Sequence, residues 1–93
     1  MRVGACRISL RISESQSLKQ KRKVVKSVID RVKNRFNIAI AEVDALDSHK
    51  TAVLGVVTVS NDSRHVNRTL SHVVDFIEDT ASAEMIEYEI ELN

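Results

Sequence analysis

Positively charged side chains gathered in one segment are the residues of this chain best suited to binding a ligand. Residues 1–36 carry eleven Lys and Arg but only two acidic residues, Glu14 and Asp30. Residues 37–93 carry three Lys and Arg and eleven acidic residues. Clustered ammonium and guanidinium groups bind phosphate through charge and hydrogen bonds. The chemistry that this segment could perform is therefore recognition of a polyanion.

Five of these eleven cations fall on one side of a predicted helix. Apolar residues recur at helical spacing from Leu18 to Phe36, which predicts an amphipathic helix. Ser17, with Gln20 three residues later, has the pattern of an N-terminal capping box, and Asn37 suits a left-handed residue after the last turn. The cations that share an arc of roughly 100° beside the apolar stripe are Lys19, Arg22, Lys23, Lys26 and Lys33.

This basic side predicts a nucleic-acid interface. Cations in the first turns oppose the helix dipole, so local helix stability does not explain them. We expect structured RNA, such as ribosomal RNA, to bind here, with an anion near the free N–H groups at the helix start. The alternative is a solvated helix face whose cations pair with carboxylates elsewhere. The predicted RNA-binding residues are Ser17, Lys19, Lys21, Arg22, Lys23, Lys26 and Lys33.

Other reactive residue types do not form the constellations that catalysis requires. Cys6 has no second thiol to pair with, and we interpret it as a small buried apolar residue. His65 and His72 lack a carboxylate or thiolate at metal-ligand spacing. Glu42 and Asp44 alternate along one strand face, at a strand end rather than as an acid–base pair. We therefore expect no enzymatic activity, no cofactor and no metal.

Length and composition indicate one cytoplasmic domain, residues 1–93. Hydrophobic residues make up 43% and charged residues 29% of the sequence, which is ordinary globular usage. No apolar run approaches the roughly 20 residues that a membrane-spanning helix needs. The first residues lack the order of a secretory signal, and one cysteine agrees with a reducing compartment.

The remaining patterns predict four strands and a second helix. Residues 3–12 alternate between apolar and polar, and residues 38–43 and 51–60 predict a hairpin around a polar turn. A second helix is expected to begin near residues 61–63. The residues expected to point inward from this helix and from the last strand are Val66, Leu70, Val73, Ile77, Ile86, Tyr88, Ile90 and Leu92.

The order βαββαβ is that of a ferredoxin-like α+β domain. Right-handed crossovers give a two-layer sandwich whose antiparallel sheet has the order 4-1-3-2, with both helices on one face. The first strand then lies beside the last, so Arg7 and Arg11 should face the outward residues Glu87, Glu89 and Glu91. Such pairs would explain part of the charge asymmetry without a ligand.

The third predicted strand is apolar on both of its faces. Leu54 and Val56 lie on one face, and Val53, Val57 and Val59 lie on the other. A strand of this kind is normally covered on both sides. We predict that a homodimer covers the second face, with the three valines at the interface; the alternative is an exposed valine patch. The middle strands contain no aromatic residue, which argues against RNA bases stacking on the sheet.

Five short segments carry a family signature: residues 17–23, 30–31, 35–37, 41–44 and 59–62. In these segments the chain resembles the YlxP-like family of bacterial proteins, and the resemblance extends over nearly the whole sequence. It implies a ferredoxin-like domain. The genes of this family often lie beside those for a ribosome-binding factor and a translation initiation factor, which implies a role near the ribosome.

Three functions follow from these patterns. The first is a non-enzymatic accessory protein that docks RNA or the ribosome through the basic helix. The second is a homodimeric protein-interaction module whose basic helix binds an acidic protein. The third is a small-molecule regulatory domain of the ACT type, which shares the strand order but has a glycine-bearing first loop that this chain lacks.

Overall fold

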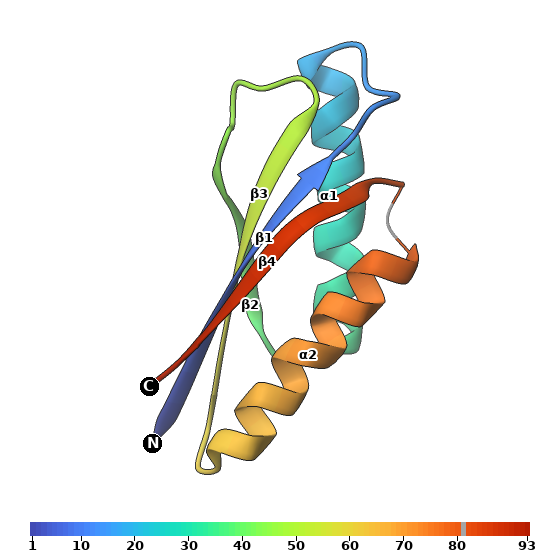
Figure 1. Ribbon diagram of the computed structural model, residues 1–93. Coiled ribbons are helices and arrows are strands. Elements are labelled where there is room, and N and C mark those ends of the chain that lie inside the picture. Colours follow the sequence, from blue (N-terminus) through green and yellow to red (C-terminus); the bar gives the residue numbers. More distant parts are fainter. Residues whose placement is uncertain (81) are drawn as a thin grey trace.

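The computed structural model describes residues 1–80 and 82–93. Over these residues the chain forms β1 (Arg2–Arg11), α1 (Leu18–Arg35), β2 (Ala39–Asp44), β3 (Thr51–Ser60), α2 (Ser63–Thr80) and β4 (Glu84–Leu92). The strands make one antiparallel sheet in the order β2-β3-β1-β4 (Figure 1). This is the predicted order taken from the other edge. The α+β architecture is confirmed and is consistent with a ferredoxin-like fold.

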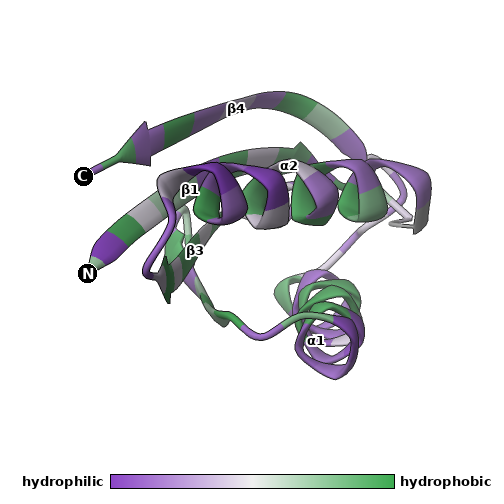
Figure 2. Cartoon of the chain, turned by 90° about the horizontal axis from the view of Figure 1, so that it is seen from below, coloured by the Kyte–Doolittle hydropathy of each residue, from purple (hydrophilic) through white to green (hydrophobic). Residues whose placement is uncertain are grey.

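Both helices pack against the same face of the sheet. α1 contacts β2 and β3, whereas α2 contacts β1, β3 and β4. Figure 2 shows α1 with its hydrophobic residues toward the rest of the molecule and its hydrophilic residues on the outer side. The other face of the sheet, called the open face here, is covered by neither helix. α1 and the open face therefore present surfaces on opposite sides of the molecule.

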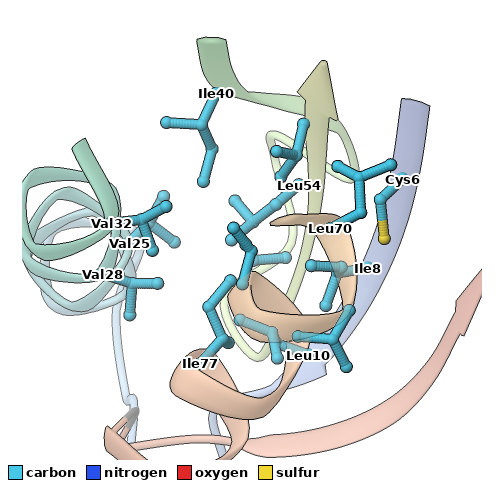
Figure 3. Packing of buried hydrophobic residues seen from close by; sticks show 14 of the residues in the cluster. Cys6, Ile8, Leu10, Val25, Val28, Val32, Ile40, Leu54, Leu70 and Ile77 are labelled. Atoms are coloured by element: carbon cyan, nitrogen blue, oxygen red, sulfur yellow. The ribbon is translucent and has the colours of Figure 1, made fainter. Parts of the chain in front are cut away.

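The core follows the period of two in the strands. Cys6, Ile8 and Leu10 of β1, and Ile12 directly after it, are buried on the helix side. One continuous cluster joins these residues to valines of α1 and to apolar residues of α2 (Figure 3). The predicted inward residues of the second helix are all buried: Val66, Leu70, Val73 and Ile77. None of the helices in the described residues is long and apolar enough to cross a membrane.

Helix α1 begins as predicted but ends differently. The Ser17 hydroxyl accepts the backbone N–H of Gln20 at 3.1 Å, as predicted, but the Gln20 side chain accepts the N–H of Gln16 at 2.6 Å and not that of Ser17, as a capping box would. The left-handed residue predicted at Asn37 is absent, because Phe36 already leaves the helix in an extended conformation, with φ −129° and ψ 148°. Its ring packs edge-on against Phe76, and the extended chain leads directly into β2.

A β-bulge at Val43 corrects one prediction about β2. The pairing with β3 shifts between Glu42, opposite Leu54, and Asp44, opposite Val53. The extra residue reverses the alternation, so Glu42 faces the helices and Asp44 faces the open side. The two carboxylates therefore lie on opposite faces of the sheet and not on one face as expected.

A second bulge, at Ile86, corrects the inward face predicted for β4. Ser9 pairs with Glu87 but Leu10 pairs with Met85, so Met85 and not Ile86 takes the position toward the core. Ile86 is exposed. Tyr88 and Leu92 share the face of Ile8 and Gly4, but they stay half exposed because β4 is an edge strand.

The close approach of α2 to β1 can be tested at Gly4. A Cβ added there would clash with Val66 Cγ1 and lie 2.9 Å from Leu70 Cδ1. We expect Gly4→Ala to lower the free energy of unfolding by about 1–3 kcal/mol through overpacking, measured by urea denaturation. The control is Gly55→Ala on the open face, where the nearest atom belongs to the exposed Val43 side chain, which can rotate. Equal losses in both variants would contradict this packing.

Candidate nucleic-acid interface

The outer side of α1 presents the predicted cations to solvent. Lys19, Arg22, Lys23 and Lys33 are all exposed. Among the residues that the structure describes, none of these four side chains forms a salt bridge. Their positive charge is therefore available to an external anion.

Lys26 is also exposed but has a partner within the helix. Its ammonium lies 2.7 Å from the Asp30 carboxylate one turn later. An exposed pair at this spacing is worth only about 0.3–0.5 kcal/mol. A phosphate can replace Asp30 at little cost, so Lys26 remains a candidate for binding.

Lys21 does not belong to the interface, which corrects the prediction. Its side chain is completely buried, and its ammonium lies 2.7 Å from the Glu42 carboxylate. The ammonium also donates to the carbonyls of Ala45 at 3.0 Å, Thr51 at 3.3 Å and Leu46 at 3.4 Å. Three N–H donors are thus shared among four oxygens, which leaves none for RNA.

The spacing of the helix contains the signal that Lys21 is internal. Lys21 follows Leu18 by three residues and precedes Val25 by four, and Val28 and Val32 continue this spacing of three or four residues. This is the spacing of the side of a helix that faces a core. The residue type suggested a surface position, but its place in the apolar stripe specifies a buried one.

The bonds of Lys21 attach the start of α1 to the β2–β3 hairpin. Glu42 lies in β2, Ala45 and Leu46 lie in the turn, and Thr51 opens β3. The same turn holds the β1–α1 connection, because the Lys50 ammonium donates to the Ser13 carbonyl at 2.8 Å. The orientation of α1, and hence of its basic side, depends on these contacts.

Ser17 acts as the cap of α1. Besides its bond to Gln20, its carbonyl accepts the Ser15 hydroxyl at 2.9 Å and the Lys21 N–H at 3.1 Å. These contacts explain Ser17 by helix structure alone. Its direct contact with a nucleic acid stays a prediction.

On the open face, Arg7 pairs with a different acid from the one expected. Arg7 is in register with Glu89, yet its guanidinium lies 2.9 Å from Asp44 on β2. The ion pair therefore crosses β3, which lies between the two strands. The pKa of the Asp44 carboxyl lies below its usual range, chiefly because the Ala45 N–H donates a hydrogen bond to it and also because of the hydrogen bond and positive charge of Arg7.

The acidic row of β4 is left without the expected partner. Within the part of the chain that is described, Glu87, Glu89 and Glu91 form no salt bridge. These carboxylates are exposed on the open face. Cross-strand pairing with β1 thus does not neutralise them by direct contact.

The three predicted interface valines divide into two groups. Val53 is buried beside the Asp44 end of β2, whereas Val57 and Val59 are exposed on the open face. Only Val57 and Val59 are therefore accessible to a partner. The structure of a single chain does not test the homodimer that the sequence suggested.

The remaining candidates for chemistry are dispersed. Burial raises the pKa of the Cys6 thiol to about 11, against the opposing effect of the Glu89 N–H. His65 and His72 are both exposed on α2. Across the described residues, no three His, Cys, Asp or Glu side chains gather in a way that could hold a metal ion.

Comparison with known proteins places the chain in a family. The profile described as "Protein of unknown function (DUF503)" matches residues 3–90. The chain belongs to the DUF503 family. A protein of Bacillus subtilis (strain 168) described as "Uncharacterized protein YlxP" is 32% identical over 76 residues, which cover 82% of this chain and 83% of the relative. The resemblance to YlxP-like proteins is therefore confirmed.

A solved structure shares the architecture of this DUF503 chain. It is "LarC2, the C-terminal domain of a cyclometallase involved in the synthesis of the NPN cofactor of lactate racemase, apo form", with a TM-score of 0.53 and 9% sequence identity. The match covers all of this chain and 55% of that one, so this chain spans about half its length. At this identity the likeness shows the fold alone.

The buried ion pair predicts a large difference between two lysines of one helix. We expect Lys21→Met to lower the free energy of unfolding by about 3–5 kcal/mol, because Glu42 and three carbonyls lose their donor inside the protein. Lys26→Met is the matched control and should cost no more than about 0.5 kcal/mol. Urea denaturation measures both. A small effect in both variants would contradict the burial of Lys21.

The Cys6 thiol predicts slow alkylation in the folded protein. A pKa near 11 in place of 9.0 lowers the thiolate fraction at pH 8 about 100-fold, and the thiolate is the reactive form. We expect iodoacetamide to react with native Cys6 at least about 100-fold more slowly than in urea, measured by mass spectrometry. Equal rates would show that Cys6 is accessible in the folded state.

Proposed function

We propose that this DUF503 protein is a non-enzymatic accessory protein that binds structured RNA through the outer side of α1, with ribosomal RNA as the target. The observation that carries the proposal is the division of the cations. Lys21 is buried in an ion pair with Glu42, and Lys26 pairs with Asp30 within the helix. In contrast, no carboxylate among the described residues pairs with Lys19, Arg22, Lys23 or Lys33.

Helix stability does not account for the three unpaired cations near the start of α1, whereas Lys33 lies in the last turn, where the helix dipole favours a cation. Lys19, Arg22 and Lys23 lie in the first two turns, where the helix dipole is positive, and the first turn contains no acidic residue. Each cation there costs a few tenths of a kcal/mol. A bound polyanion would offset this cost, which supports a role in binding.

The shape of the surface favours contact with the RNA backbone. An exposed helix carrying Lys and Arg can place its charges along a row of phosphates, and such contacts depend little on sequence. The open face does not support base stacking, because its central strands have no aromatic side chain and its edge is acidic. We therefore propose recognition of RNA shape and charge by α1, within the cytoplasm.

A second candidate function is a protein-interaction module that uses the sheet. The exposure of Val57 and Val59 on the open face favours it. The two functions use opposite sides of the molecule, so one does not exclude the other.

If the cations of α1 bind RNA, the affinity should depend steeply on salt concentration, and this dependence should weaken when those cations are removed. If about four phosphates are contacted, the logarithm of affinity should fall with the logarithm of salt concentration at a slope of about −3 to −4. We expect Lys19→Gln/Arg22→Gln/Lys23→Gln to flatten this slope by about 2–3. Fluorescence anisotropy with a labelled ribosomal RNA hairpin measures both quantities.

The control has the same change of charge away from α1. Arg2→Gln/Arg64→Gln/Arg68→Gln alters three exposed arginines and should leave the slope nearly unchanged. Equal losses in both variants would indicate unspecific attraction by net charge. No binding of the wild-type protein at low salt would end the proposal. Co-sedimentation with ribosomal subunits then shows whether the RNA is ribosomal.

A further inference from the structure

The open face combines an apolar patch with an acidic row. Val43, Val57 and Val59 are 50%, 45% and 57% exposed, and they lie on β2 and β3. The row of Glu87, Glu89 and Glu91 lies on β4 at the edge of the same sheet. Exposed apolar residues bordered by charge are typical of a protein-binding surface.

A shallow hollow joins the two parts of this surface. It has a volume of about 250 Å³, and its lining includes Ala5, Gly55 and Val57 together with Glu89 and Glu91. Gly55 has no side chain, so the backbone of β3 forms part of the floor. The hollow therefore has an apolar floor and carboxylates on one side.

The Arg7–Asp44 ion pair leaves these carboxylates without a cation of their own chain. Arg7 also lines the hollow, but its guanidinium is bonded to Asp44 on the far side of β3. Glu89, its neighbour in register, forms no salt bridge among the described residues. The acidic side of the hollow is thus free to bind an external cation.

We propose that the open face docks a partner protein whose contact surface is apolar and basic. A Lys or Arg side chain has the matching chemistry, since its apolar stem can pack on Ala5, Gly55 and Val57 while its charged end reaches Glu89 or Glu91. Apolar side chains of the partner cover Val57 and Val59. Charge complementarity along β4 fixes the orientation of the partner.

Charge also argues against a second copy of this chain as the occupant. Aligned packing of two identical sheets places β4 either on the partner's β4 or on its β2. The first arrangement brings glutamates together, and the second brings them toward Asp44. A dimer confined to β2 and β3 would bury the valines but leave the acidic row outside the contact.

This surface is independent of the proposed RNA interface. The open face and the outer side of α1 lie on opposite sides of the molecule (Figure 2). The protein then has one basic surface for a polyanion and one acidic, apolar surface for a basic protein. Failure of either activity leaves the other measurable.

The test is a titration of the isotope-labelled protein, followed by NMR, with a capped helical peptide made of Leu and Lys. We expect the amide shifts to change around the hollow, in β1, β3 and β4, and binding to weaken with salt. A peptide with Glu in place of Lys should leave the amides around the hollow unshifted. Absence of binding by the Lys peptide at low salt, or shifts confined to the helices, would overturn the proposal.

Variants that remove acidic charges test whether the β4 glutamates bind the Lys peptide. Glu87→Gln/Glu89→Gln/Glu91→Gln should weaken binding of the Lys peptide about tenfold, as expected for the loss of three exposed ion pairs. Glu14→Gln/Asp47→Asn/Glu78→Gln changes the same charge at exposed positions elsewhere and should weaken it less than about twofold. Equal weakening would overturn the proposal.

Sedimentation equilibrium tests whether a second copy of this chain covers the open face. We expect the wild-type protein to remain a monomer at the concentrations of the NMR titration. A dimer that Val57→Arg converts into a folded monomer would assign the open face to a second copy and overturn the proposal. The folded state of that variant is checked by its circular dichroism.

Discussion

The buried ion pair between Lys21 and Glu42 determines how the first helix is presented. A buried lysine is tolerated only where its charge and its N–H groups find partners, and Glu42 and three carbonyls of the hairpin supply them. With Lys21 turned inward, residues two positions away lie nearly opposite on the helix, which completes a turn in 3.6 residues. Lys19 and Lys23 therefore point outward. One internal lysine thus orients the cations on either side of it.

Local sequence patterns predicted most of the fold because most of it obeys them. The third strand has the predicted bounds, Ser17 caps α1, and the stripe of α2 is buried. The bulges at Val43 and Ile86 were missed, because an extra residue in one strand depends on its pairing with another strand and leaves no mark in the alternation. The left-handed conformation predicted for Asn37 is wrong for a similar reason, since the packing of Phe36 decides where the helix ends.

The site was less predictable because charges of one kind serve different purposes. Composition identified the basic segment, and the spacing of Lys21 within the apolar stripe could have separated it from its neighbours. The choice of Arg7 between Glu89 in register and Asp44 across β3 could not be inferred, since it depends on the bulge that turns Asp44 outward. That choice leaves the acidic row exposed and gives the two sides of the protein opposite character.

We propose that the two layers of the molecule present opposite charges to two different partners. The most direct measurement is an NMR titration of one sample, first with the ribosomal RNA hairpin and then with the Leu and Lys peptide. We expect RNA to shift the amides of α1, and the peptide afterwards to shift those around Gly55 and Glu89 without displacing the RNA. Overlapping sets of shifts, or displacement of the RNA from α1 by the peptide, would contradict it.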